Sequence, residues 1–139
     1  MNDIHPVIIP ILLFTVWTLT LTIFVVGFRT VKVLQGKKKS NEFPAWEKHG
    51  EGFYWRLHRS QQNCIEYLPI FATISILGIL LEIEQPLFTQ FAYVVFGGRL
   101  FQTLSHWSGE GVWNVNFRFT GLAVQLIGFV SMVSLLCLE

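Results

Sequence analysis

The sequence predicts an all-α integral membrane protein, folded as a bundle of four transmembrane helices. Of its 139 residues, 52% are hydrophobic and only 14% are charged. The apolar residues come in long blocks rather than in alternating or heptad patterns, which is typical of membrane spans. We expect one membrane domain over residues 1–139, with helices over residues 7–33, 53–81, 86–107 and 115–138.

The first helix, predicted over residues 7–33, is apolar or rich in threonine until Arg29. Pro6 and Pro10 suit its first turns, because proline is tolerated where a helix begins. Arg29 and Lys32 lie at its far end, where long cationic side chains reach the lipid headgroups. The glycines and lysines of the next segment predict a loop.

The second helix, predicted over residues 53–81, carries a polar stripe in its first half. Arg56, Arg59, Asn63 and Glu66 fall within roughly 80° of one another on a helix, with Gln62 at the edge. Such groups are costly in hydrocarbon and usually face a bundle interior or a wet cavity. The stripe suits a ligand with carboxylates and an ammonium, because Arg binds carboxylates and Glu pairs with cations. The alternative is an internal Arg–Glu pair that serves only helix packing.

The third helix, predicted over residues 86–107, carries a second polar stripe. Arg99, Gln102 and His106 fall within roughly 60° of one another on one face. A single short chain has little room to bury two separate stripes in a membrane. We therefore expect the chain to associate with other copies of itself.

The fourth helix is predicted over residues 115–138, after a loop over residues 108–116. Arg118 lies in its first turn, where its charge adds to the positive end of the helix dipole. Taken alone, an arginine at this place is more often an anchor at the lipid headgroups.

Basic residues near the ends of the helices predict the orientation in the membrane. The first loop holds Lys37, Lys38, Lys39 and Lys48, whereas the turn near residue 84 and both termini hold no Lys or Arg. Because cytoplasmic loops carry an excess of Lys and Arg, we expect the first and third connections in the cytoplasm. Both termini then lie on the opposite side, and the polar residues of all four helices meet at the cytoplasmic face.

The remaining composition argues against several other functions. The formal net charge is only +1, so no nucleic-acid partner is expected. Cys64 and Cys137 are too few and too far apart for a disulfide framework, and the histidines show no metal-ligand spacing, so no metal is expected.

The second helix also carries a motif that is specific to one family. Arg59-x-x-x-Asn63-x-x-Glu66-Tyr67-x-Pro69 resembles the second-helix signature of MAPEG, the membrane-associated proteins of eicosanoid and glutathione metabolism. Residues 61–71 are most similar to the branch of leukotriene C synthase and microsomal glutathione transferase 2. We expect a bacterial member of the family.

The resemblance implies a homotrimer that binds glutathione between its subunits. Arg118 matches the arginine beside the glutathione thiol and is expected to be catalytic. His106 stands where the family usually has tyrosine. The resemblance also implies the glutathione-binding residues, which are Arg29, Arg59, Gln62, Asn63, Glu66, Tyr67, Arg99 and His106.

The implied function is a membrane-bound glutathione transferase, with glutathione peroxidase as a further activity. Glutathione is then the co-substrate, and lipophilic electrophiles arrive through the bilayer. A nearby cation lowers the pKa of a thiol and so favours the thiolate that attacks the electrophile. The alternatives are a non-catalytic scaffold or lipid-binding protein of the same fold and, less favoured, a small transporter subunit. Arg59 and Arg118 favour the enzyme.

Overall fold

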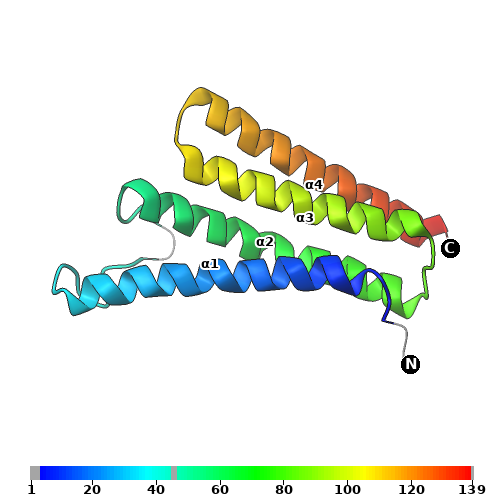
Figure 1. Ribbon diagram of the computed structural model, residues 1–139, viewed down its shortest axis with the longest axis horizontal. Helices are drawn as coiled ribbons and strands as arrows, with labels where there is room; N and C mark the ends of the chain where they lie inside the picture. The colour runs from blue at the N-terminus through cyan, green and yellow to red at the C-terminus, as the bar shows by residue number, and fades with distance from the viewer. Residues whose placement is uncertain (1–3, 45–46, 139) are drawn as a thin grey trace.

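The computed structural model describes residues 4–44 and 47–138, and these form four antiparallel helices (Figure 1). They are α1 (Ile8–Leu34), α2 (Gly52–Leu80), α3 (Pro86–Ser108) and α4 (Val112–Leu138). The first three lie within one residue of their predicted bounds at each end.

The fourth helix begins three residues earlier than predicted. Gly109 ends α3 with a φ of 151°, a conformation that favours glycine, and α4 starts at Val112. The connection therefore needs only residues 109–111 rather than the predicted 108–116. As a result Arg118 lies in the second turn of α4 and not in the first.

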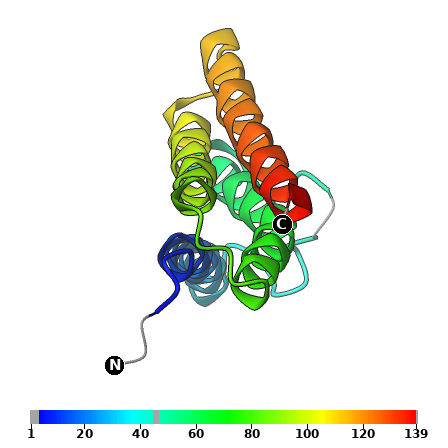
Figure 2. The same cartoon turned by 90° about the vertical axis from the view of Figure 1, so that its right-hand side faces the viewer.

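The helices pack with α1 and α4 at diagonally opposite corners of the bundle (Figure 2). The closest pair is α3 and α4, where glycines let the two backbones approach. A Cβ atom on Gly121 would lie 3.0 Å from the carbonyl oxygen of Gly98, and one on Gly98 would lie 3.1 Å from that of Gly121. No side chain fits between the helices at this contact.

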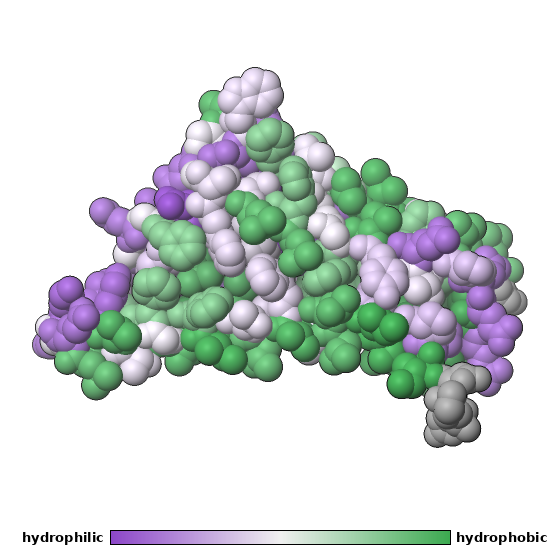
Figure 3. Space-filling model, in the orientation of Figure 1, coloured by the Kyte–Doolittle hydropathy of each residue, from purple (hydrophilic) through white to green (hydrophobic). Residues whose placement is uncertain are grey.

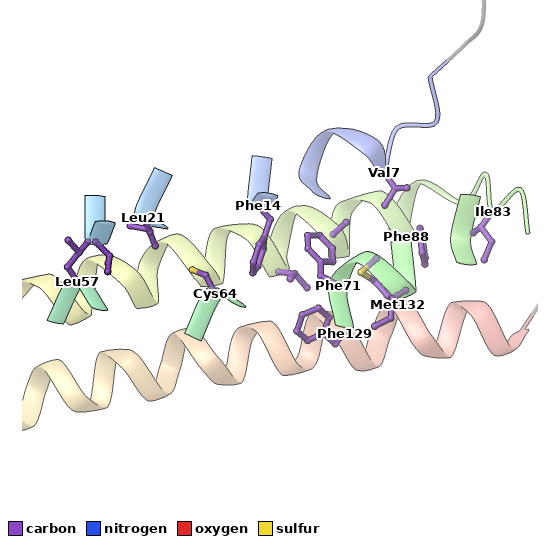
Figure 4. Close-up of a cluster of buried hydrophobic side chains, with 14 of the residues drawn as sticks. Val7, Phe14, Leu21, Leu57, Cys64, Phe71, Ile83, Phe88, Phe129 and Met132 are labelled. Carbon is purple, nitrogen blue, oxygen red and sulfur yellow. The ribbon is translucent and has the colours of Figure 1, made fainter. Parts of the chain in front are cut away.

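The hydrophobic core joins α1, α2 and α4 through three buried phenylalanines (Figure 4). The ring centroid of Phe71 lies 5.4 Å from that of Phe14 and 5.9 Å from that of Phe129, both in tilted or edge arrangements. Such aromatic pairs contribute about 0.5–1.5 kcal/mol each beyond the area that they bury. These rings therefore hold together the half of the bundle that contains the start of α1 and the end of α2. The polar groups lie toward the other half.

Three of the described helices, α1, α2 and α4, are long and apolar enough to cross a membrane. Hydrophobic side chains dominate the middle of the surface, and hydrophilic ones gather at its two ends (Figure 3). The remaining helix, α3, is not apolar enough to be identified as a membrane span by its composition. The reason is its buried face, which holds Arg99, Gln102, Thr103, Ser105 and His106. The prediction that α3 also crosses the membrane therefore stays a prediction.

One end of the bundle holds both the α1–α2 and the α3–α4 connections, and we call it the loop end (Figure 1). The start of α1, the end of α4 and the α2–α3 turn lie at the other end. The second half of α1, the first half of α2, the last part of α3 and the start of α4 meet at the loop end. These are the segments that carry the predicted site residues.

Candidate functional site

A pocket of about 310 Å³ opens at the loop end among α2, α3 and α4. We call it the arginine pocket. Two of its arginines, Arg56 and Arg59, share one face of α2 because they are three residues apart. The third, Arg118, comes from α4. The full lining is Lys48, Trp55, Arg56, Arg59, His106, Glu110 and Arg118.

The charge of the arginine pocket favours an anion. Three guanidinium groups and the ammonium of Lys48 face a single carboxylate, that of Glu110. Arg118 Nη2 donates a hydrogen bond to the carbonyl oxygen of Gly109, which ties Arg118 to the end of α3. The Nε atoms of Arg56 and Arg118 are buried and have no hydrogen-bond partner among the described residues. Donors of this kind are available to carboxylate groups of a ligand.

His106 and Asn63 contact each other directly, across the interface of α3 and α2. Asn63 Nδ2 lies 3.0 Å from His106 Nε2. When the amide donates to Nε2, the ring proton resides on Nδ1, and this N–H group is the donor left for other partners. His106 also lines the arginine pocket, so the pair links the α2 stripe to the pocket.

Arg99 lies deeper in the bundle, with only 1% of its surface exposed. Its Nη1 donates to Gln102 Oε1 at 2.8 Å, and Gln125 Nε2 donates to the same oxygen at 3.0 Å. Its guanidinium carbon lies 4.8 Å from the ring centroid of Tyr67 and 5.6 Å from that of Phe14. Its Nε and Nη2 atoms have no hydrogen-bond partner among the described residues.

Glu66 and Arg59 lie on the outward face of α2, and both are exposed. No hydrogen bond or salt bridge joins Glu66 to another described residue, but its charge interacts with that of Arg99 on α3. The internal Arg–Glu interaction of the packing interpretation is therefore present as a longer-range attraction. Because Glu66 is exposed, its carboxylate is also accessible to a partner outside the protomer.

Gln62 takes a smaller part in the stripe. Its Nε2 donates to Gln61 Oε1 at 3.1 Å, and the side chain is half-buried. Gln61 in turn donates to Thr22 Oγ1 of α1 at 3.3 Å. This chain of amides connects the α2 stripe to α1 and leaves the carbonyl group of Gln62 open to a ligand.

Arg29 lies in a different pocket. Its Nε donates to the Tyr54 hydroxyl at 3.0 Å, and its Nη2 lies 3.5 Å from His58 Nδ1. The pocket that it lines, of about 350 Å³, shares no residue with the arginine pocket. Within one protomer, Arg29 and Arg59 therefore line separate pockets.

The structure adds three residues to those that the sequence predicts for the arginine pocket, namely Lys48, Trp55 and Glu110. Lys48 and Glu110 belong to connections, which no periodicity places. Gln125 also joins the network of Arg99. The sequence indicates a role for Gln125, because it is the one strongly polar residue in an apolar stretch of α4 after Arg118. Among the described residues, no three His, Cys, Asp or Glu side chains gather as a metal site would require.

Comparison with protein-family models identifies the family of the chain. The sequence model of the MAPEG family matches residues 7–138, a range that includes all four helices and every predicted site residue. No match was found among the curated proteins.

Proposed function

Since the chain belongs to the MAPEG family and is an integral membrane protein, we propose that it is a glutathione transferase acting on lipophilic electrophiles. Family membership favours a membrane function in glutathione or eicosanoid metabolism. The observation that carries the transferase proposal is the arginine pocket. It has three arginines beside a stripe on α2 that ends in the exposed Glu66.

The charges of the site complement those of glutathione, which has two carboxylates and one ammonium. Arg59 and Glu66 are seven residues apart on α2, or about 10 Å along a helix. An extended tripeptide spans about the same length. Arg59 and Arg56 would bind carboxylates at one end of glutathione, and Glu66 would bind the ammonium at the other.

Arg118 would act on the thiol. It enters the pocket from α4, across from the α2 stripe, and its Nε has no partner among the described residues. A cation beside the sulfur lowers the thiol pKa, and each unit corresponds to about 1.4 kcal/mol. The thiolate would then form the sulfur–carbon bond with the electrophile while the carbon–leaving-group bond breaks, as chloride leaves an aryl chloride. In a peroxidase reaction the thiolate would attack the O–O bond of a lipid hydroperoxide, which releases the alcohol and leaves a sulfenic acid. A second glutathione would convert that sulfenic acid into the disulfide and water.

The electrophile would arrive from the bilayer. On α4, exposed aromatic side chains flank Arg118, and they are Trp113, Phe117 and Phe119. Side chains of this kind suit the boundary between hydrocarbon and water. A lipophilic substrate that follows this surface reaches the mouth of the arginine pocket without crossing water.

We further propose a homotrimer with the site between subunits, as the resemblance of the α2 motif implies. Two observations support association: the charged Glu66 is exposed on an apolar helix, and Arg29 lies outside the arginine pocket. An adjacent subunit would bring its Arg29 to the glutathione that Arg59 holds. The lysines of the α1–α2 connection favour a cytoplasmic position for the loop end and the opposite side for both termini.

A conjugation assay tests this proposal. Detergent-purified protein, glutathione and 1-chloro-2,4-dinitrobenzene should form the conjugate well above the uncatalysed rate. The Arg59→Ala variant should lose most of that rate, whereas Lys37→Gln, which changes an exposed loop charge, should keep it. No conjugation or peroxidase activity from folded protein that binds glutathione would instead support a non-catalytic member of the family.

A further inference from the structure

Three buried polar side chains gather where the α1–α2 connection meets α1 and α2. They are His49, Tyr54 and His58, which are 5%, 4% and 2% exposed, and we call them the His49 cluster. Polar groups are costly to bury unless hydrogen bonds satisfy them, and apolar side chains would pack here without that cost. The cluster therefore calls for a role beyond packing.

The hydrogen bonds of the His49 cluster run in one direction, from Arg29 to the backbone of the connection. Arg29 Nε donates to the Tyr54 hydroxyl oxygen at 3.0 Å, because a guanidinium only donates. At the other end, the carbonyl oxygen of Glu47 only accepts, so His49 Nδ1–H donates to it at 3.1 Å. In the neutral ring, His49 Nε2 then accepts from the Tyr54 O–H group at 2.9 Å. Tyr54 thus links the cation of α1 to the connection in an order that satisfies all three hydrogen bonds.

A second set of contacts holds the same guanidinium. Arg29 Nη2 lies 3.5 Å from His58 Nδ1, and Arg29 Cζ lies 5.5 Å from the ring centroid of Phe43. No hydrogen bond joins the third nitrogen, Nη1, to another described residue. The protein therefore fixes two nitrogens of the guanidinium and leaves the Nη1 group available to a carboxylate.

The His49 cluster also contacts the wall of the arginine pocket. The ring of Trp55, which lines that pocket, has its centroid 5.6 Å from that of His49 and 5.5 Å from that of His58. Lys48, the residue before His49, lines the pocket as well. The cluster therefore joins Arg29 to the part of the molecule that carries the proposed site.

We propose that Tyr54 is a positioning residue, which fixes the guanidinium of Arg29 in the orientation that receives a glutathione carboxylate. The inference rests on the proposed function, in which Arg29 reaches the glutathione of an adjacent subunit. An arginine that is ordered before the ligand arrives loses less conformational entropy on binding. Tyr54 acts through Arg29 and makes no contact with glutathione itself.

The variant Tyr54→Phe tests this role, because it removes only the hydroxyl group. Its ring keeps the contacts with Phe28, Phe43 and His58 that pack the cluster. Tyr54→Phe should raise the Kd for glutathione about tenfold, while kcat at saturating glutathione stays within about twofold of the parent. The matched control Tyr93→Phe removes the hydroxyl group of an exposed tyrosine on α3 and should change neither quantity.

A double-mutant cycle separates positioning from a merely structural role. In the Arg29→Ala background, Tyr54→Phe should change the Kd by less than about twofold, because the group that it positions is gone. An equal loss of affinity in both backgrounds would overturn the proposal, and so would an unchanged Kd in Tyr54→Phe alone. Either result leaves the proposed function standing.

A measurement without glutathione separates this inference from the proposed function. In protein with isotope-labelled arginine, NMR should show a slowly exchanging Nε–H proton that Arg29→Ala removes and that exchanges fast in Tyr54→Phe. Fast exchange in the parent would overturn the positioning role. A protected proton in a parent protein that binds no glutathione would support the hold of Tyr54 on Arg29 and overturn the proposed function instead.

Discussion

At the scale of single residues, the contact between Asn63 and His106 determines which donors the site offers. The family motif leads one to expect a tyrosine hydroxyl at position 106, which both donates and accepts. Here the imidazole Nε2 is occupied by Asn63, and Nδ1–H is the remaining donor. The pair also holds Asn63, so its amide oxygen is presented in a fixed direction. A histidine at this place therefore keeps a donor in the pocket while bracing α2 against α3.

The affinity for glutathione should depend on Arg59 and Glu66 far more than on the lysines of the α1–α2 connection. Arg59→Ala and Glu66→Ala should each weaken glutathione binding by roughly 2–5 kcal/mol, because a charge on the ligand loses its partner. Lys38→Gln should change it by about 0–1 kcal/mol at most. Isothermal titration of the folded variants measures this. Unchanged affinity in Glu66→Ala would remove its role as the ammonium partner.

The α2 stripe could be predicted from spacing, because Arg56 and Arg59 share a face whatever the helix packs against. The contact of Asn63 with His106 could not, since it depends on how α2 and α3 are rotated against each other. Lys48 and Glu110 lie in connections, which have no period that would place them. The separation of Arg29 from the arginine pocket also depends on packing and not on the sequence of α1.

At the scale of the elements, α3 combines a buried polar face with a close glycine contact. Its polar residues point into the bundle, and Gly98 lets α4 come near enough for Gln125 to reach Gln102. The α3–α4 pair is thus a unit that fixes the Arg99 network. The same pair brings Arg118 to the pocket through the short connection after Gly109.

Substitution of glycine by alanine should have opposite effects at two places. Gly121→Ala puts a Cβ atom 3.0 Å from the Gly98 oxygen and 2.9 Å from Gln102 Cβ, and should destabilise the fold by about 1–3 kcal/mol. Gly27→Ala places its methyl group in open space and should stabilise α1 by up to about 1 kcal/mol. Unfolding of both variants in detergent measures the difference. Equal stability would mean that α3 and α4 do not meet through Gly121.

At the scale of the whole molecule, the antiparallel order of the helices brings the α1–α2 and α3–α4 connections, and the arginines of the helices beside them, to one end. Four helices, their lengths and their order could be predicted, because long apolar blocks separated by glycine-rich and lysine-rich segments admit few other arrangements. The predicted start of α4 is wrong by three residues. The connection is shorter than its composition suggests, because a single glycine with positive φ, Gly109, ends α3 abruptly. How subunits would meet follows from neither the order nor the lengths.

If the site lies between subunits, two inactive variants should restore activity in one mixed oligomer. Arg29→Ala and Arg59→Ala would each lack one residue of every site as pure oligomers. Random mixing should rebuild intact sites in about a quarter of the cases, as expected for a heterologous ring interface. Conjugation by co-expressed, co-purified variants measures this. If co-expression adds nothing to the two separate rates, Arg29 and Arg59 do not act on one ligand across an interface.

The most direct test of the account is the ionisation of bound glutathione in the Arg118→Ala variant. The parent protein should show thiolate absorbance on titration with glutathione, with the thiol pKa below that of free glutathione. Arg118→Ala should bind glutathione within about tenfold of the parent, or roughly 1.4 kcal/mol, because the α2 stripe is intact. Its thiolate absorbance and turnover should fall much further, since the lost interaction is made mainly with the anion. An unchanged thiol pKa and an unchanged rate of conjugation would contradict the account and leave Arg118 as an anchor.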